Sequence, residues 1–561
     1  MDIRKNAFAF LTFEDLFGRK SDYNELEQKI ERQDNIAYML PLLSQLASLR
    51  PNSNDYALIV SDFMKYLDFL MKRELDSAKE LYPEFDVVAG MKEIQRRFKN
   101  VIRERVFSSP QVSMFLMKHL MVLGSFDSDK EIVDSRLDYI ETIKMLLMTA
   151  DHTSPPSING VLVEVFRSYM FYSTSELGTH LSRALYIYCD LARKEELFGN
   201  EFVDINKKFE EQFGCSVEDY IFILFAMHAL FQKKLLDKGT LTYNWFQDVD
   251  FTFKKTKLTK VANDIVKSIS FTFEEANEEL KETYKNPWEF KLFMEKPLFR
   301  FKDEAVYPVN MKFLEDNFYE GLFWKMRSCY PEDDSSFQAF FGRPFEMYGQ
   351  NLIHESCKKS NVPYEVIPEF EYTKPGASSK ILSPDIIVRL GSKLLVVECK
   401  AQRINYTGSI INGDMDSIEA DRVKMTVKPM KQLYTRMTEL LDGASEEVKF
   451  DGINELFLIV VNQGVYPVLK PLHNKTLEDW KQLEGINIET NLYVMNVEEL
   501  EMLASIIEKQ KPIFGILKHK NHFKYAPIKN FLSKQHRTLK RPQILSEALD
   551  KLDELSAERF I

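Results

Sequence analysis

The sequence is poor in glycine and in cysteine. Only 20 glycines occur among 561 residues, which argues for long helices and few tight hairpins. The five cysteines are too far apart for a zinc knuckle and too few for a disulfide framework in a chain of this length. They are Cys189, Cys215, Cys329, Cys357 and Cys399. We expect reduced thiols, as in a cytoplasmic protein.

Long apolar runs are also missing. The longest, Ile221 to Phe231, contains His228 and is too short to cross a bilayer. Near the start of the chain, Glu14 and Asp15 stand where the apolar stretch of a signal peptide would run. The sequence therefore predicts no membrane association and a cytoplasmic location.

The composition is that of a globular protein with several domains, because hydrophobic residues make up 45% and charged residues 28% of a long chain. Its formal net charge of -11 is unevenly distributed. Between Lys511 and Arg541 there are nine Lys or Arg and no acidic residue. A nucleic-acid partner is therefore not excluded by the acidic total, since binding depends on local charge.

The first half of the chain shows helical periodicity. In Asp62–Leu75 the apolar residues recur at spacings of three and four, and polar residues lie off that stripe. Two prolines in residues 153–157 cannot continue a helix. We predict an all-α domain over residues 1–285, with a division near 153–157, that senses a trigger or binds a protein partner or a second copy.

Strand-like and helical segments alternate after this point, which predicts an α/β domain over residues 286–510, with a mixed sheet flanked by helices. Residues 511–561 form a basic C-terminal extension. The expected strands are Lys296–Phe301, Ala305–Val309, Tyr364–Tyr372, Asp385–Leu390, Lys393–Cys399, Leu456–Val461 and Asn491–Met495. The expected helices are Leu314–Met326, Phe340–Lys358 (with Pro344 in its first turn) and Lys428–Leu441, and Arg403–Glu419 is expected to be a loop.

Charged residues stand at the end of one predicted strand. Glu398 and Lys400 alternate with apolar residues, so their side chains share one face. A short Leu390-Gly391-Ser392 link predicts a hairpin that brings Asp385 toward Glu398. Two carboxylates on rigid strands suit Mg²⁺, with Mn²⁺ as a substitute, and the backbone carbonyl of Cys399 is a candidate further ligand. Such a metal activates water, and Lys400 offsets charge on a phosphorus under attack.

Pro384, Asp385, Glu398 and Lys400 together resemble the PD-(D/E)XK nuclease superfamily, with Cys399 at the variable position. The resemblance covers roughly residues 288–511 and implies a restriction-endonuclease-like fold. It also implies a metal-dependent phosphodiesterase, and many relatives of this kind act in prokaryotic defence.

The resemblance extends to flanking helices. Glu346 matches the acid of the family's first helix and is implied as a third metal ligand. Gln432 is the implied polar residue of the later helix, with Lys428 and Arg436 one turn to either side as nucleic-acid contacts. Tyr434 follows Gln432 too soon for the Gln-x-x-x-Tyr element of exonuclease-like branches, which favours endonuclease cleavage.

The basic extension interleaves lysines with aromatic residues, an arrangement suited to phosphates and unpaired bases. Its candidate contacts are Lys518, Lys520, Lys524 and Lys529. The alternative is a basic face packed against an acidic neighbouring domain. The other candidates also have an alternative interpretation, in which they are solvent-exposed residues without a catalytic role. It applies to the pair Glu398 and Lys400, to Glu346, and to the pair Gln432 and Arg436.

We therefore expect an Mg²⁺-dependent endonuclease, with DNA favoured over RNA, that defends against foreign nucleic acid. One alternative is a nucleic-acid-binding module that kept the fold without cutting. Another is a helical scaffold or adaptor, which the large helical half supports.

Overall fold

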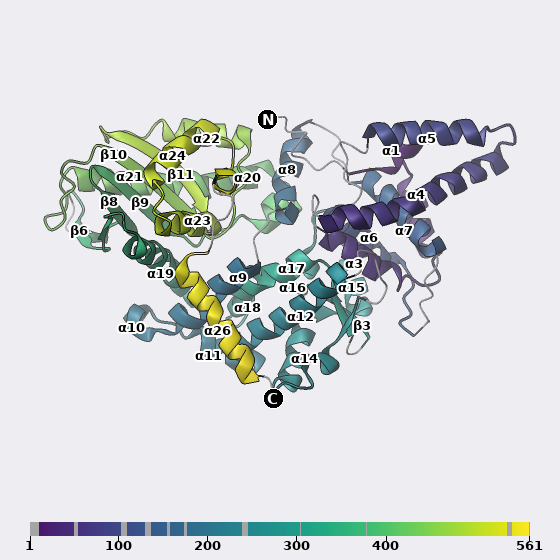
Figure 1. The fold of residues 1–561 in the computed structure, drawn as a ribbon, viewed down its shortest axis with the longest axis horizontal. Coiled ribbons are helices and arrows are strands. Elements are labelled where there is room, and N and C mark those ends of the chain that lie inside the picture. The colour runs from purple at the N-terminus through teal and green to yellow at the C-terminus, as the bar shows by residue number, and fades with distance from the viewer. Residues whose placement is uncertain are drawn as a thin grey trace. The chain divides into compact units, whose positions relative to one another are not determined.

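The computed structural model describes residues 10–49, 54–101, 109–129, 136–153, 158–172, 177–237, 245–302, 305–376, 379–535 and 541–559 (Figure 1). The chain divides into two compact units, and each is discontinuous in sequence. The first unit comprises Met1–Ser173, Asp219–Leu322 and Ser556–Ile561, and the second comprises Thr174–Glu218 and Phe323–Leu555.

These limits differ from the expected boundaries at residues 285/286 and 510/511. Residues 286–322 belong to the first unit, and nearly all of the C-terminal extension belongs to the second. The expected division at 153–157 lies mostly outside the described residues, and the chain on both sides of it belongs to one unit.

The first unit is mainly helical, as expected, but it also holds a small sheet of order β1-β4-β3-β2. The hairpin expected near residue 300 is present as β3 and β4, which pair in antiparallel fashion inside this unit and not in the α/β domain. The strands are β1 (Gln247–Asp248), β2 (Ser270–Phe271), β3 (Leu298–Lys302) and β4 (Ala305–Pro308). The helices are α1 (Phe13–Phe17), α2 (Tyr23–Glu31), α3 (Met39–Ser48), α4 (Asn54–Leu81), α5 (Val87–Val101), α6 (Pro110–Leu123), α7 (Arg136–Asp151), α8 (Ile158–Tyr172), α12 (Val217–Asp237), α13 (Val249–Phe253), α14 (Thr259–Ser268), α15 (Phe273–Leu280), α16 (Lys291–Glu295), α17 (Met311–Asp316) and the π-helix η5 (Asn317–Gly321).

The second unit contains a five-stranded mixed sheet and a two-stranded one. The strands are β5 (Glu365–Ile367), β6 (Glu371–Thr373), β7 (Lys380–Leu382), β8 (Ile386–Leu390), β9 (Lys393–Lys400), β10 (Glu455–Asn462) and β11 (Glu489–Asn496). The helices are α9 (Leu177–Ala184), η2 (Leu185–Asp190), η3 (Leu191–Arg193), α10 (Glu195–Phe198), η4 (Gly199–Glu201), α11 (Ile205–Phe213), α18 (Leu322–Arg327), α19 (Ser336–Lys359), η6 (Tyr406–Ile411), α20 (Met415–Arg422), η7 (Val423–Val427), α21 (Lys428–Leu441), α22 (Lys470–Trp480), α23 (Val497–Glu508), α24 (Ile513–Lys520), η8 (Asn521–Phe523), α25 (Ile528–Gln535) and α26 (Gln543–Arg559).

The larger sheet has the order β11-β10-β9-β8-β5. Strands β9, β10 and β11 are parallel, whereas β8 is antiparallel to β9 and β5 to β8. All eight residues of β10 are buried, as befits a parallel strand in the middle of a sheet with both faces covered. At the β8–β9 turn, Gly391 adopts a φ of 60°, a conformation that glycine adopts without strain. The expected mixed sheet and its hairpin are thus present.

One face of this sheet is covered by α21. Met430, Leu433 and Met437 are fully buried and share a core with Leu394 and Val396 of β9. The bounds of α21 agree with those expected from the sequence. On the other face, Gly349 of α19 packs close to side chains of β8, β9 and α23.

Three local expectations were wrong. The helix expected from Phe340 begins earlier, so Pro344 lies inside α19 and not in its first turn. The single strand expected over Tyr364–Tyr372 is divided between β5 and β6, which belong to different sheets. The loop expected over Arg403–Glu419 contains η6 and most of α20.

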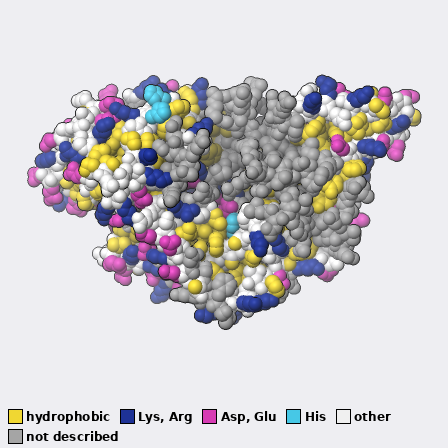
Figure 2. Space-filling model, viewed as in Figure 1, with side chains coloured by type: hydrophobic (Ala, Val, Ile, Leu, Met, Phe, Trp, Pro, Cys, Tyr) yellow, Lys and Arg dark blue, Asp and Glu magenta, His cyan; other side chains and the backbone are white. Residues whose placement is uncertain are grey.

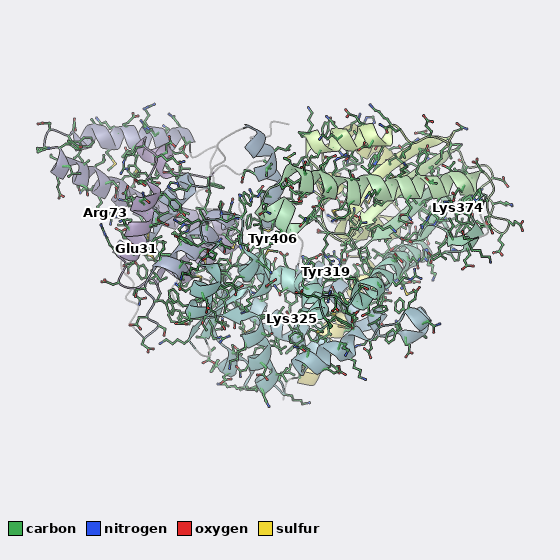
Figure 3. All side chains as sticks on the ribbon, turned by 180° about the vertical axis from the view of Figure 1, so that it is seen from behind. Glu31, Arg73, Tyr319, Lys325, Lys374 and Tyr406 are labelled. Carbon is green, nitrogen blue, oxygen red and sulfur yellow. The ribbon has the colours of Figure 1, made fainter. Side chains whose placement is uncertain are left out.

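Helices α20, η7 and α21 follow one another without a gap. Figure 3 shows this continuous helix, with Tyr406 and Lys374 labelled toward its two ends. A π-type turn at η7 is a local irregularity of the kind that often accompanies functional sites.

Within the described residues, no single helix has the length and apolar content needed to span a membrane. One bent pair, Ile205–Phe213 with Val217–Leu235, meets the requirement by length and composition alone.

We predict that Gly349→Ala destabilises the protein, although alanine normally stabilises a helix interior by about 0.5–1 kcal/mol relative to glycine. A Cβ added at Gly349 would lie 2.6 Å from Sγ of Cys399, so the packing of α19 on β9 must shift. Overpacking of this kind costs roughly 1–3 kcal/mol, measurable as a lower midpoint of urea unfolding.

The matched control is Cys399→Ala, which removes the sulfur. In that background Gly349→Ala should become neutral or stabilising. A single Gly349→Ala variant as stable as the wild type would contradict the proposed close approach of helix and strand.

Candidate functional site

The hairpin brings together the three residues that the sequence singled out. Because Ile386 pairs with Val397 in the β8–β9 register, Asp385 lies beside Glu398 at the edge where β9 ends. Oδ2 of Asp385 accepts a hydrogen bond of 2.6 Å from the backbone N–H of Cys399. Nζ of Lys400 donates to Oε1 of Glu398 at 2.7 Å. The two carboxylates and the ammonium thus occupy one end of the sheet.

Arg436 of α21 joins this group from the covering helix. Its Nη1 atom lies 3.0 Å from Oε1 and 3.1 Å from Oε2 of Glu398. The side chain of Glu398 is only 1% exposed, so its charge depends on Arg436 and Lys400. The sequence placed Arg436 among nucleic-acid contacts, whereas in the structure it neutralises a candidate metal ligand.

Glu346 of α19 contributes a third carboxylate. Arg343 donates to it at 2.9 Å from the preceding turn of the helix. Burial raises the pKa of Glu346, the charges of Lys400 and Arg343 oppose that rise, and Glu398 adds to it. The side chain therefore interacts electrostatically with Lys400 and Glu398 of the hairpin.

The carboxylates of Asp385, Glu398 and Glu346 repel one another in a largely buried environment. Burial, followed by the charges of Glu398 and Glu346, raises the pKa of Asp385 well above its usual range. Burial disfavours the charged ammonium of Lys400, but Glu398 outweighs it and the pKa of Lys400 is raised. A divalent cation between Asp385 and Glu398 would relieve the repulsion between their carboxylates, so the donor set fits Mg²⁺ or Mn²⁺.

Within the described residues, no group of three or more His, Cys, Asp or Glu side chains is already arranged to hold a metal ion. A metal at Glu398 would compete with the ion pairs that Arg436 and Lys400 form with this carboxylate. Octahedral Mg²⁺ needs few protein ligands and keeps several waters, so two carboxylates can be sufficient protein ligands for it.

The thiol of Cys399 takes no part in this arrangement. It is fully buried, burial raises its pKa well above the usual range, and its sulfur faces Gly349. Only the backbone of this residue reaches the candidate site, through its N–H bond to Asp385.

Glu369 is a fourth acid near the site, and the sequence did not identify it. It follows β5, and burial raises its pKa while Arg343 and a hydrogen bond from Gln350 oppose the rise. It also interacts electrostatically with Glu398 and Arg436. No local signal marks it, because the segment resembled one continuous strand.

Gln432 and Lys428 are exposed on α21, and the structure gives Gln432 no recorded bond to the hairpin residues. It lies one turn before Arg436, on the same side of the helix. The polar residue that the helix supplies to the candidate site is Arg436.

Asp421 of α20 is buried. It accepts hydrogen bonds from the backbone of Asn405 at 2.6 Å and from Oγ of Ser409 at 2.7 Å. Nζ of Lys424 donates to it at 2.8 Å. These bonds hold the segment that leaves the site after β9.

Three of the four candidate lysines of the C-terminal extension are engaged within the second unit. Lys518 contacts Glu455 at 2.5 Å and Glu489 at 3.0 Å, and Lys529 contacts Glu498 at 2.7 Å. Lys520 is buried, and its Nζ donates to the backbone of Phe523. Of the four expected phosphate contacts, only Lys524 is exposed.

The aromatic side chains of this extension also pack on one another. The ring of His519 lies 5.4 Å from Phe523 and 5.5 Å from Phe531. In Figure 2, histidines gather over the region of α22 and α24. The extension therefore differs from the expected open stripe of lysines and rings, and the acids that engage it come from its own unit.

Comparisons of the chain with protein-family models, curated proteins and solved structures gave no match.

We predict that Asp385→Asn stabilises the metal-free protein. An amide keeps an acceptor for the N–H of Cys399 and removes one of the mutually repelling charges. The free energy of unfolding in EDTA should rise by on the order of 1 kcal/mol, the usual size of a single-site effect. Thermal unfolding monitored by circular dichroism measures it.

Added Mn²⁺ supplies the matched comparison. It should raise the melting temperature of the wild type more than that of Asp385→Asn, because the variant has lost a ligand. A variant less stable than the wild type in EDTA would show that repulsion at Asp385 is not the dominant effect.

Proposed function

We propose that the second unit is an Mg²⁺-dependent nuclease of restriction-endonuclease-like fold that cuts phosphodiester bonds within DNA. One observation carries this proposal. Asp385, Glu398 and Lys400 lie together at the end of the sheet where β8 begins and β9 ends, and Glu346 interacts with them electrostatically. Acids that repel one another at the end of an apolar strand contribute little to stability, which favours a functional reason for their presence.

The arrangement of elements also supports the proposed fold. A long helix bearing Glu346 precedes the sheet, a hairpin bears the acids, and a helix covers the same strand. This order agrees with the resemblance found in the sequence, in which the acid-bearing helix comes before the Pro-Asp strand.

The position of each side chain in the site suggests its role in phosphodiester cleavage. Asp385, Glu398 and Glu346 would hold Mg²⁺, which supplies a bound water of lowered pKa and polarises a phosphoryl oxygen. Lys400 is positively charged and stands beside Glu398, where it can orient the attacking water and offset charge on phosphorus. Arg436 can release Glu398 to the metal and turn toward a substrate phosphate.

Defence against foreign nucleic acid, a cytoplasmic location and a partner-binding or self-associating role of the first unit belong to the same proposal. They rest on the resemblance and on the separate helical unit.

A second candidate function is a nucleic-acid-binding module that does not cut. The ion pairs from Lys400 and Arg436 to Glu398 favour it, because a carboxylate held by two cations is less available to a metal. The two candidates differ in one measurable respect, which is metal-dependent cleavage.

We predict that Glu398→Gln lowers the cleavage rate at least on the order of a hundredfold, because an uncharged amide is a poor ligand for Mg²⁺. The assay follows conversion of supercoiled plasmid to nicked and linear forms, with Mg²⁺ or with EDTA. Glu365→Gln, at an exposed position of β5 in the same sheet, is the matched control and should cut at the wild-type rate. A wild-type protein that leaves plasmid, linear DNA and RNA intact with Mg²⁺ and with Mn²⁺ would favour the binding module.

We further predict that Arg436→Gln lowers the Mg²⁺ concentration needed for half-maximal activity by roughly tenfold. The variant removes a cation that competes with the metal for Glu398, and one charge at this distance is worth ~1 kcal/mol or more. Lys431→Gln removes the same charge from an exposed position of the same helix and should not change the midpoint. If the Mg²⁺ concentration at half-maximal activity were unchanged in Arg436→Gln, the arginine would not compete with the metal for Glu398.

A further inference from the structure

One tryptophan of the second unit is exposed. Trp324 of α18 is 56% exposed, whereas Trp245 is 0%, Trp288 3% and Trp480 7% exposed. A single exposed aromatic residue does not by itself mark a binding site, but an exposed indole offers a large flat face on which a ligand ring can stack. Trp324 is therefore the one indole of this chain available to a ligand.

Its neighbours hold it beside a cation. The ring of Trp324 meets that of Phe323 edge to face at 5.1 Å, and the guanidinium of Arg403 lies 3.6 Å from the centroid of Phe323. The same guanidinium is 5.8 Å from the centroid of Trp324. Phe323 is itself fixed by Phe337 and Phe341 of α19, at 5.2 and 4.8 Å. The platform is thus supported by a long helix and not by a loose loop.

Arg403 also ties this platform to the candidate active site. It is the third residue after Lys400, so their Cα atoms are at most about 11 Å apart. The N–H of Gln402 donates to the carbonyl of Lys400 at 2.7 Å, and that of Gly464 donates to Gln402 at 2.9 Å. The absence of a side chain at Gly464 allows this approach, because an added Cβ would lie 3.1 Å from the Cα of Arg403.

We propose that Trp324 and Arg403 form a stacking subsite for an unpaired nucleobase next to the metal site. In a duplex the faces of the bases are covered by their neighbours, so an exposed indole is suited to an unpaired one. The guanidinium beside it can pair with the adjoining phosphate. This inference deepens the proposed function: the preferred substrate is single-stranded DNA, or DNA with an unpaired segment near the cut.

Binding is tested in EDTA, so that no cleavage occurs. The probes are a dye-labelled twelve-nucleotide oligo-dT and a blunt duplex of the same length, followed by fluorescence anisotropy with the full chain. Trp324→Ala should weaken oligo-dT binding roughly tenfold, the effect of one lost stacking contact. Trp324→Phe keeps an aromatic face and should bind within about threefold of the wild type, and neither variant should change duplex binding.

Tryptophan fluorescence gives a second readout. Oligo-dT should quench the emission of the wild type, and the quenching should be lost in Trp324→Phe, since the other three indoles are buried. Equal oligo-dT affinities of wild type and Trp324→Ala, or no quenching at saturation, would overturn the stacking subsite.

The outcome of the oligo-dT binding test can be distinguished from the outcome of the plasmid cleavage test. A chain that cuts plasmid but binds oligo-dT independently of Trp324 keeps the proposed function and loses this subsite. A chain that never cuts but binds oligo-dT through Trp324 loses the nuclease and keeps the subsite. A wild type that binds neither probe overturns the subsite outright.

Discussion

The antiparallel pairing of β8 with β9 determines which side chains meet at the edge of the sheet. Successive residues of a strand point to opposite faces, so a shift of one residue in this register would send Glu398 and Lys400 to the side of α19. The observed register instead keeps Glu398 on the face covered by α21, where Arg436 reaches it, and leaves the thiol of Cys399 against Gly349. The contacts among Asp385, Glu398, Lys400 and Arg436 follow from that one alignment.

Charge balance is the second constraint. Four acids, Asp385, Glu398, Glu346 and Glu369, lie near three cations, Lys400, Arg436 and Arg343, and Asp385 and Glu398 are buried. Removing one cation from such a group leaves a buried charge without a partner, which is far more costly than the loss of a surface pair. In the proposed enzyme a divalent metal would supply the missing positive charge, because it would bind two of the carboxylates. The ion pairs therefore suit a metal-free resting state of the proposed enzyme.

The sequence predicted local features of this unit well and long-range ones poorly. Local sequence signals identified the bounds of α21 and the β8–β9 hairpin, since both depend on residues near one another in the chain. It failed at Pro344, where packing of α19 tolerates a proline inside a helix, and at Glu369, which a strand-like pattern concealed. The role of Arg436 was missed for another reason: it depends on a partner 38 residues away.

The basic C-terminal extension illustrates how clustering in sequence differs from clustering on a surface. Nine cations without an acid predict a phosphate-binding stripe, yet Lys518 and Lys529 neutralise acids of β10, β11 and α23. A phosphate would have to replace carboxylates already in place, so these lysines contribute less attraction to a polyanion than their number indicates. Positive charge near the proposed cut must then come from residues beside the sheet edge. Arg403 and the exposed Lys428 flank the segment between β9 and α21, and in the proposed enzyme they would add positive charge on the substrate side.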